Sequence, residues 1–286
     1  MSGYSTRKVN TGNYNTFFCE GGNPGNEAII FIHGSGPGAN SETNWRHIIP
    51  AFSDRYHVVA LDILGFGNTD HPENGPKVNV EWMAAWLEQI VELMDHLKID
   101  KANLVGNSLG GIISLNLTME YPERINKVTL MGSSSGGGGA LKQGPSPELS
   151  KLRSFWIQPS FRKLKNITKW FVYDDSILGD NLEEILKERW ETVSRPDVRR
   201  SATSGMFAGD PNGNVVPPAA LRRMTNPFLL LHGVNDRVVP HEGSLALMEH
   251  LPNAQLHLYS QCGHWIQVEK RDSFINKLAA FLEERL

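Results

Sequence analysis

The sequence predicts an α/β fold, with a mostly parallel central sheet flanked by helices and a helical cap, or lid, inserted into it. Short apolar runs that suit buried strands recur along the chain, and they begin near residues 28, 56, 102, 127, 227 and 255. Segments with apolar residues at helical spacing separate most of these runs. Because such alternation typically builds a parallel sheet wrapped by helices, it indicates an α/β core domain.

The expected strands and helices follow from local patterns in the sequence. A polar N-terminal segment is expected to form a hairpin before the first apolar run, AIIFI, at residue 28. The run ANLVG leads into a helix expected over residues 108–121, which stops before Pro122. Two further helices are expected from apolar faces: Trp82, Trp86, Ile90, Leu93 and Leu97 within residues 80–97, and Phe274, Leu278 and Phe281 in the C-terminal tail.

Residues 136–210 break the alternation of strands and helices. The run GSSSGGGGA indicates a flexible hinge, and the segments after it are amphipathic and rich in aromatic and basic residues. We expect a helical cap over residues 136–210, inserted between core-domain segments 1–135 and 211–286. The charges of FRKLKNITKW fit a solvated helix face better than an anion-binding patch.

Composition narrows the classes of partner. The 286 residues carry 28 basic and 31 acidic side chains, a formal net charge of −3, which gives no field that would gather nucleic acid or an anionic membrane. The apolar runs fall short of the about 18 residues that a spanning helix needs, and the N-terminus lacks an apolar export segment. The only cysteines are Cys19 and Cys262, which fits a reducing compartment. We expect a cytoplasmic protein with a small-molecule partner.

The stretch LVGNSLGGIISL contains the pattern GxSxG, at Gly106, Ser108 and Gly110. A strand enters it and a helix leaves it, which is the context of a nucleophile elbow, where a strained turn lifts the serine hydroxyl above the sheet. A tight turn whose serine merely caps the helix would match the same pattern. The rest of the chain must therefore supply a base and an acid.

A serine hydroxyl becomes a good nucleophile only when a positioned base takes its proton. His264 follows the last strand run, in SQCGHW, so its loop should emerge at the same sheet edge as Ser108. Asp236 follows the preceding run, in LLLHGVNDRVVP, and is the best acid. Asp62 is kept as a rival acid or a structural residue. Cys262 is a weaker nucleophile candidate, since nothing marks an activated thiol.

Attack on a carbonyl also needs two backbone amides to bind the oxyanion, and losing one typically costs about 3 kcal/mol of transition-state stabilisation. Leu109, directly after the serine, is expected to supply one amide. Ser35 in the loop FIHGSGPGAN is expected to supply the other, and Gly34 and Gly36 beside it let the backbone approach a ligand.

The same loop also satisfies a dinucleotide-binding pattern, with Gly34, Gly36 and Ala39 followed by Asp62 at the end of the next strand run. This alternative leaves the later serine, aspartate and histidine unexplained, and Pro37 disfavours a close-packed helix start. A phosphate-binding P-loop lacks its lysine, and HEGSLALMEH has Leu245 where a zinc helix needs histidine. We expect no metal and no cofactor.

The order Ser108, Asp236, His264 is that of the α/β-hydrolases. With these residues in hand, the chain resembles an α/β-hydrolase over nearly its whole length. Within that fold it resembles the meta-cleavage product hydrolases, which cut carbon–carbon bonds in ring-fission products of aromatic degradation. The resemblance rests on HGSGPGANSETNW, GNSLGG, LKERWE with the following RPDVRRS, HGVNDRVVP and CGHWIQVE.

The resemblance implies Ser108 as nucleophile, His264 as base and Asp236 as its orienting acid, in agreement with the reading of the residues themselves. It adds Arg189, which matches the arginine at the carboxylate and oxo end of the substrate, where a planar guanidinium can grip both groups. It also adds three residues that line the same pocket: Asn44, Asn107 and Trp265. Without the motif, Arg189 would read as a surface helix charge.

The implied reaction is hydrolysis of 2-hydroxy-6-oxo-hexa-2,4-dienoates to 2-hydroxypenta-2,4-dienoate and a carboxylic acid. The resemblance also implies a homo-oligomer, a dimer or higher. Two other functions stay open: a carboxylesterase with the same triad, and a non-catalytic ligand receptor on the same fold. The polar stretch SSSGGGGALKQGPSPELSKL departs from the common family pattern, so the C6 substituent is left open among alkyl, aryl and hydrogen.

Overall fold

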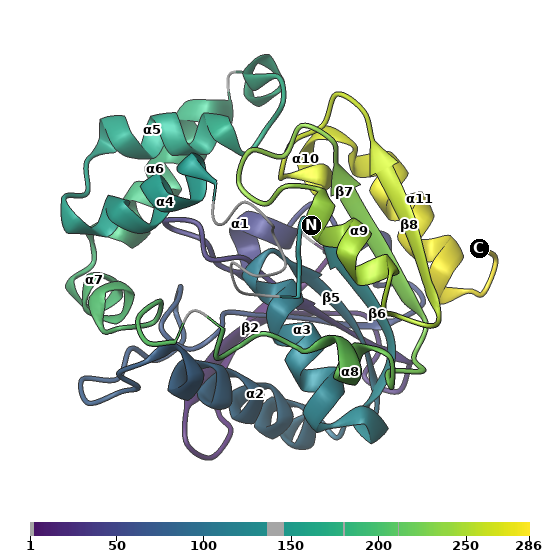
Figure 1. Cartoon of the computed structure of the whole chain (residues 1–286). Helices are drawn as coiled ribbons and strands as arrows, with labels where there is room; N and C mark the ends of the chain where they lie inside the picture. Colours follow the sequence, from purple (N-terminus) through teal and green to yellow (C-terminus); the bar gives the residue numbers. More distant parts are fainter. Residues whose placement is uncertain (1–2, 136–145, 180, 211) are drawn as a thin grey trace.

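The computed structural model describes residues 3–135, 146–179, 181–210 and 212–286, and it contains an eight-stranded sheet in the order β1-β2-β4-β3-β5-β6-β7-β8 (Figure 1). The strands are β1 Ser5–Asn10, β2 Asn15–Gly21, β3 Ala28–Ile32, β4 His57–Leu61, β5 Ala102–Asn107, β6 Ile125–Met131, β7 Phe228–Gly233 and β8 Ala254–Tyr259. The first two strands form the expected hairpin, and β2 pairs antiparallel with β4. All pairings from β4 through β8 are parallel. The predicted strand runs are therefore confirmed.

The three helices that apolar spacing predicted are present, over Asn79–His96, Leu109–Glu120 and Arg271–Leu282. The α-helices are α1 Ser41–Trp45, α2 Asn79–His96, α3 Leu109–Glu120, α4 Pro147–Ser154, α5 Phe161–Trp170, α6 Asn181–Ser194, α7 Pro196–Thr203, α8 Pro218–Leu221, α9 Glu242–Met248, α10 Ile266–Glu269 and α11 Arg271–Leu282. Four 3₁₀ turns are η1 Ile49–Ala51, η2 Pro122–Arg124, η3 Phe155–Ile157 and η4 Asp175–Leu178. Among the described residues, no helix is both long enough and apolar enough to cross a membrane.

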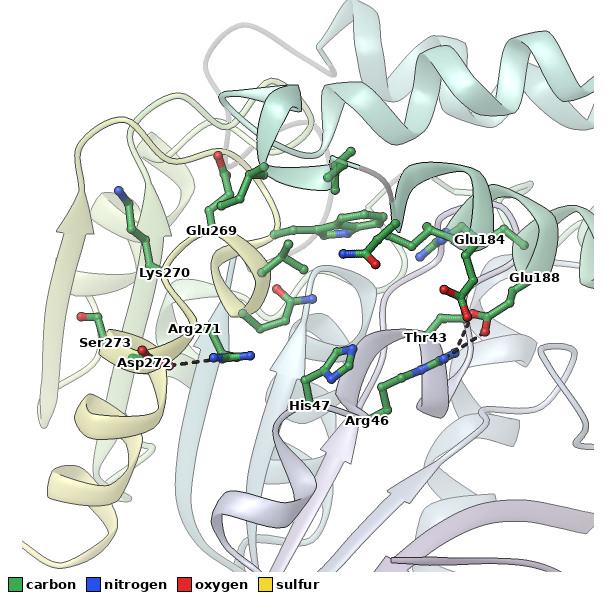
Figure 2. A pocket seen from close by; sticks show the side chains of 18 residues that line it. Thr43, Arg46, His47, Glu184, Glu188, Glu269, Lys270, Arg271, Asp272 and Ser273 are labelled. Atoms are coloured by element: carbon green, nitrogen blue, oxygen red, sulfur yellow. Dashed lines mark hydrogen bonds and ion pairs between the residues drawn. The ribbon is translucent and has the colours of Figure 1, made fainter. Parts of the chain in front are cut away.

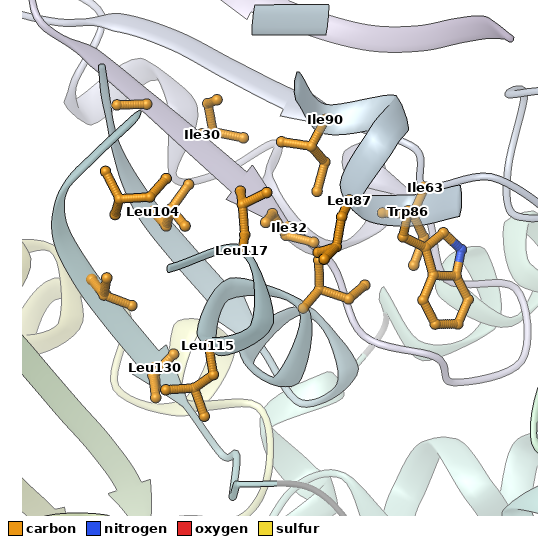
Figure 3. Packing of buried hydrophobic residues seen from close by; sticks show 14 of the residues in the cluster. Ile30, Ile32, Ile63, Trp86, Leu87, Ile90, Leu104, Leu115, Leu117 and Leu130 are labelled. Atoms are coloured by element: carbon orange, nitrogen blue, oxygen red, sulfur yellow. The ribbon is translucent and has the colours of Figure 1, made fainter. Parts of the chain in front are cut away.

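The sheet separates two apolar layers, because successive strand residues point to opposite faces. In β3, Ile30 and Ile32 pack with α2 and α3 on one face, whereas Ile29 and Phe31 pack with α1 and α11 on the other. Figure 3 shows the first layer, where Trp86, Leu87 and Ile90 of α2 lie close to strands β3 and β5. A strand buried on both faces reads as a continuous apolar run, which is why AIIFI carries no polar residue.

Helices α4 to α7, which we call the cap helices, lie apart from the helices that cover the sheet (Figure 1). They have an apolar cluster of their own, which includes Phe155, Leu164 and Leu186 and also takes in Val238 and Trp265 from loops that follow β7 and β8. The domain boundaries at residues 135 and 211 stay a prediction. The glycines of the expected hinge, residues 136–139, lie outside the described residues.

Candidate active site

Ser108 follows β5 directly, in the middle of the sheet, and its backbone lies at φ 54° and ψ −115°. A positive φ is unfavourable for a residue with a side chain, so the turn is strained. Space around it requires small neighbours, since a Cβ on Gly106 would overlap the Gly110 carbonyl and a Cβ on Gly110 would overlap the Ile32 carbonyl. The geometry matches the strained strand-to-helix turn of a nucleophile elbow.

The alternative reading of Ser108 as a simple helix cap does not fit the structure. Ser108 is the residue before helix α3, but its side chain makes no capping hydrogen bond. Its hydroxyl makes no other hydrogen bond within the described part of the chain. The side chain instead lines a small cavity together with His264.

His264 and Asp236 meet at the carboxyl edge of the sheet, in the loops after β8 and β7. The imidazole Nδ1 lies 2.6 Å from Asp236 Oδ2, and the two side chains are 3% and 0% exposed. The other carboxylate oxygen, Oδ1, accepts the backbone N–H groups of Val238 and Val239 at 2.8 and 2.9 Å. Asp236 is thus held on both oxygens, and it can fix the orientation of the ring.

A second histidine, His232 in β7, also faces the Asp236 carboxylate. Its Nε2 lies 2.8 Å from the Val239 carbonyl oxygen and 3.3 Å from Asp236 Oδ2, while Nδ1 lies 2.7 Å from Ser244 Oγ. Burial by itself raises the pKa of Asp236, but His264 and His232 outweigh it and hold the pKa below its ordinary value. The acid therefore stays ionised, as an orienting carboxylate must.

Gly132, directly after β6, leaves room for this pair. Its φ is +55°, and a Cβ at this position would lie 3.0 Å from His264 Nδ1 and 3.3 Å from Asp236 Oδ2. Both the backbone angle and the space therefore disfavour any side chain here. The sequence pattern gave no sign of this role.

The predicted oxyanion donors lie on both sides of the serine. The Leu109 amide belongs to the first turn of α3, where helical N–H groups have no partner within the helix. Ser35 follows Gly34, and a Cβ on Gly34 would lie 3.1 Å from the Ser108 Cβ, so this loop passes directly beside Ser108. Within the described residues, neither amide donates to a protein acceptor.

The reaction cavity, as we call the space beside Ser108, brings most of the predicted residues together. All of them except Asp236 and Leu109 line it: Gly34, Ser35, Gly36, Asn44, Asn107, Ser108, Arg189, His264 and Trp265. Its other lining includes Leu149, Leu152 and Val238. The volume is about 20 Å³, enough for about one water molecule.

Arg189 of α6 is a buried cation without a carboxylate partner in the described part of the chain. Its residue surface is 2% exposed, one guanidinium nitrogen donates to the Pro37 carbonyl at 2.7 Å, and its Nε has no hydrogen-bond partner. Burial lowers the pKa of Arg189 to about 10, so the group is still charged at neutral pH. An unpaired buried charge is costly, and an anionic ligand in the cavity would relieve that cost.

Next to Arg189, stacked aromatic rings join the cap helices to the core domain. The guanidinium carbon of Arg189 lies 4.7 Å from the Trp265 ring centre, and Trp265 stacks on Phe171 at 4.7 Å with an 18° interplanar angle. Phe171, which follows α5, also stacks on His264 at 5.7 Å. Arg189 and His264 are therefore connected through a continuous stack.

Glu269 in α10 joins the loop of His264 to the segment after α5 by hydrogen bonds to the backbone of both. One of its oxygens accepts the Gly263 N–H at 2.6 Å, in the loop of His264, and the other accepts the Tyr173 N–H at 2.7 Å, in the segment after α5. The Trp265 N–H adds a bond to the Phe171 carbonyl at 2.8 Å. Neither Phe171 nor Glu269 was predicted, because each acts through residues distant in sequence.

An outer cleft of about 670 Å³ opens between α6 and the start of α11 (Figure 2). Among its lining residues, Arg46 forms a two-point ion pair with Glu188, at 2.9 and 2.6 Å. The wall that this cleft shares with the reaction cavity is formed by Arg189 and Trp265. Its other charges are mixed in sign, as Glu184, Lys270 and Arg271 illustrate (Figure 2).

The remaining predicted binding residues surround the serine. Asn44 Nδ2 donates to Asn107 Oδ1 at 3.3 Å, and Asn107 Nδ2 donates to the Met131 carbonyl at 3.1 Å. Both side chains are buried. A Cβ on Gly36 would lie 3.0 Å from the Phe171 ring, so a side chain here would crowd the aromatic stack.

The rival residues have other surroundings. Asp62 is fully buried and accepts the backbone N–H groups of Ser41 and Asn68 at 2.7 Å each, so it holds loops of the core domain together. Burial raises the pKa of the Cys262 thiol, which keeps that sulfur protonated and unreactive. Neither residue lines the reaction cavity.

Comparison with known proteins agrees with this fold. Residues 27–271 match the alpha/beta hydrolase fold family. The chain is 35% identical to 2-hydroxy-6-oxo-2,4-heptadienoate hydrolase of Pseudomonas putida, covering 91% of this chain and 89% of that one. It is 37% identical to 2-hydroxy-6-oxo-6-phenylhexa-2,4-dienoate hydrolase of Comamonas testosteroni, covering 91% and 88%. A solved structure of the hydrolase with that same substrate name from Rhodococcus sp. strain RHA1 superposes with a TM-score of 0.92, at 36% identity and 98% and 99% coverage.

Proposed function

This chain belongs to the alpha/beta hydrolase fold family, and we propose that it hydrolyses the C5–C6 bond of 2-hydroxy-6-oxo-hexa-2,4-dienoates. It is a hydrolase that acts on carbon–carbon bonds, and its relatives are named as hydrolases of 2-hydroxy-6-oxo-dienoates. The observation that carries the substrate class is Arg189, a buried and unpaired cation in the same cavity as Ser108 and His264. Such a group fits a small anion with a reactive carbonyl, as the dienoate is.

Binding begins with the charged end of the substrate. The planar guanidinium of Arg189 can donate to the C1 carboxylate and to the oxygen on C2 together. Asn44 and Asn107 are buried donors and acceptors in the same cavity. The apolar part of the lining, Leu149, Leu152 and Val238, favours an uncharged alkyl or aryl group on C6.

The substrate must first become an electron sink. Moving the proton of the 2-hydroxyl group to C5 converts the dienol into a 2,6-diketone with a C3–C4 double bond. Contacts of Arg189 with the C2 oxygen favour the keto form, because a cation draws electron density toward that oxygen. An ordinary ester needs no such step, which explains why this cavity contains a buried arginine.

Ser108 then attacks the C6 carbonyl. His264 takes the hydroxyl proton on Nε2, and Asp236 holds the ring and stabilises the imidazolium. The Ser35 and Leu109 amides bind the oxyanion that forms on C6. Each step uses one of the predicted site residues in its proposed role.

Collapse of this adduct breaks the C5–C6 bond. The bonding electrons move from C5 through the conjugated chain to the C2 oxygen, and protonation by His264 gives 2-hydroxypenta-2,4-dienoate. The other fragment stays on Ser108 as an ester. Water, deprotonated by His264, hydrolyses this ester and releases the carboxylic acid, so the overall reaction consumes one water.

The test is loss of the coloured dienolate on a panel of substrates with hydrogen, alkyl or aryl groups on C6. Wild-type enzyme is expected to bleach at least one of them and to release the two predicted products. Unchanged absorbance over the whole panel would refute the proposal.

Rapid turnover of p-nitrophenyl esters that survives Arg189→Met, without diketone cleavage, would identify a carboxylesterase. Ligand binding without any turnover would identify a receptor.

We also propose that the enzyme acts in the cytoplasm as a homo-oligomer. The charge balance and the cysteine content support the first part, and the family resemblance supports the second. Light scattering after size-exclusion chromatography tests the oligomer, and a mass equal to one chain of 31.9 kDa would refute it.

A further inference from the structure

We propose that His33 is a positioning residue that fixes the plane of the Gly34–Ser35 peptide bond, and with it the direction in which the Ser35 N–H points at the substrate oxyanion. The inference rests on the proposed function, because it assumes that Ser35 supplies an oxyanion donor. His33 itself lies outside the residues that line the reaction cavity.

His33 follows β3 directly and is completely buried. Its Nδ1 lies 2.7 Å from the Gly34 carbonyl oxygen, and its Nε2 lies 3.2 Å from the backbone nitrogen of Ile63. The Ile63 N–H can only donate, so Nε2 must be the accepting nitrogen. Nδ1 therefore carries the proton and donates it to Gly34.

Peptide geometry transmits this bond to Ser35. The Gly34 carbonyl and the Ser35 N–H belong to one planar unit, and no peptide bond of the described residues is cis. In a trans unit the C=O and the N–H point in opposite directions. A bond that fixes the Gly34 oxygen therefore also fixes the Ser35 N–H.

Such a restraint is needed at this place. A Cβ on Gly34 would approach Ser108 and Asn107, so this position lacks one. The wide φ and ψ range of glycine lets the planar Gly34–Ser35 peptide unit turn as a whole into other orientations. An oxyanion hole works by holding its donors in place before charge develops. His33 provides the restraint that a side chain at position 34 cannot.

The surroundings of the ring keep it in the required form. Phe66 packs edge-on against it with ring centres 5.3 Å apart. Burial, and to a smaller degree the charge of Arg189, lowers the pKa of His33 to about 4, so the ring is neutral at neutral pH. A neutral ring can donate on one side and accept on the other, and the two observed contacts require both.

Two substitutions separate the two contacts of the ring. In His33→Asn, the amide nitrogen can take the place of Nδ1 and still donate to Gly34, while the contact with Ile63 is lost. In His33→Gln, the longer amide reaches the position of Nε2 and can accept from Ile63, while the donor to Gly34 is lost. The two variants carry the same amide group and so match each other in polarity and chemistry. For each variant, kcat and KM are measured on the dienolate.

The proposal predicts that His33→Asn stays within about tenfold of wild-type kcat, whereas His33→Gln loses about 10²- to 10³-fold in kcat with little change in KM, the size of losing one oxyanion donor. Equal kcat values for the two folded variants, the reverse order, or a loss confined to KM would overturn it. Circular dichroism and thermal melting establish that each variant is folded.

Should His33→Gln not fold, His33→Ala takes its place, and the affinity of a phenylboronic acid, whose serine adduct mimics the oxyanion, gives a second measurement. Binding about 10²-fold weaker in His33→Ala than in His33→Asn supports the proposal, and equal binding overturns it. Failure of the proposed function is a separate result, seen as inactivity of wild-type enzyme on every dienolate. The variants would then be ranked on an ester instead.

Discussion

The carboxylate of Asp236 lies 2.6 Å from Nδ1 of His264, although the two residues come from loops after different strands. Parallel strands bring the loops after their carboxyl ends to one edge of the sheet, and this arrangement places the pair beside the turn of Ser108. Because the Asp236 side chain is fully buried and ionised, its influence on the imidazole is little screened by solvent.

Asp236→Asn should leave the fold intact and lower kcat by about 10⁴-fold, as removal of an orienting carboxylate does when it sets the wrong tautomer. The amide keeps the size of the side chain and one acceptor oxygen. Steady-state kinetics on the dienolate check this, with Asp62→Asn as the comparison. A mild loss in the first variant together with a large one in the second, both folded, would transfer the acid's role to Asp62.

Gly132→Ala should lower kcat strongly through a single added methyl group. The new Cβ would lie 3.0 Å from His264 Nδ1, at a backbone angle of +55° that disfavours alanine, so the Asp236–His264 contact must shift. Kinetics together with a thermal melt separate misplacement of the base from general destabilisation. A variant with wild-type kcat would show that the site tolerates this displacement.

Arg189→Met should lower the activity of the enzyme without lowering its thermal stability. Removing a buried, unpaired charge relieves its desolvation cost, so we expect the melting temperature to stay level or to rise. Loss of charge-assisted hydrogen bonds to the substrate, worth about 1.5–3 kcal/mol each, should lower kcat/KM by at least 10²-fold. Thermal melting and dienolate kinetics check the two halves. Destabilisation combined with unaffected kcat/KM would make Arg189 a structural residue.

Glu269→Gln should loosen the connection between the cap and the loop of His264. An amide presents only one acceptor oxygen to the Gly263 and Tyr173 N–H groups, and its NH₂ group would face the other donor. We expect a loss of about tenfold in kcat/KM and a melting temperature lowered by a few degrees. Asp272→Asn, an exposed acid three residues away, is the control, and equal effects of the two substitutions would contradict this role.

The stability of the fold should depend on the protonation of His33. Its pKa is lowered from 6.5 to about 4 in the folded chain, so between these values the unfolded chain binds a proton that the native ring does not. The contribution is present above pH 6.5 and is lost as the pH falls toward 4, by about 3 kcal/mol in all. Urea unfolding at pH 7 and 4.5 measures it. His33→Asn should lose less stability over this interval, and an equal loss would argue against the shift.

The sequence was sufficient to predict a strand or a site residue wherever one short local pattern determined its position. Each strand buried on both faces reads as an uninterrupted apolar run, so β3 was predicted to the residue, as AIIFI. Ser108 was proposed from the sequence because a strained turn demands glycine two residues before and after the serine, and the structure has such a turn at this position. Asp236 and His264 were proposed as a pair because loops after consecutive parallel strands share a sheet edge, and the two side chains are in contact.

Contacts that depend on packing could not be predicted in this way. Glu269 reaches the backbone of Tyr173, 96 residues earlier, and no local pattern marks either partner. His232 lies inside an apolar strand run and reads as a structural histidine until the loop after it folds back. His33 did have a signal, since it is a polar residue at the end of a buried strand, immediately before the glycine loop.

The measurement that tests the central claim most directly is a product analysis of wild-type enzyme and Ser108→Ala with the same dienolate. Wild-type enzyme should convert the substrate into 2-hydroxypenta-2,4-dienoate and one equivalent of the acid. Ser108→Ala should bind the substrate and release neither product. Equal product formation by the two proteins would contradict a serine nucleophile at position 108, and with it the proposed course of the reaction.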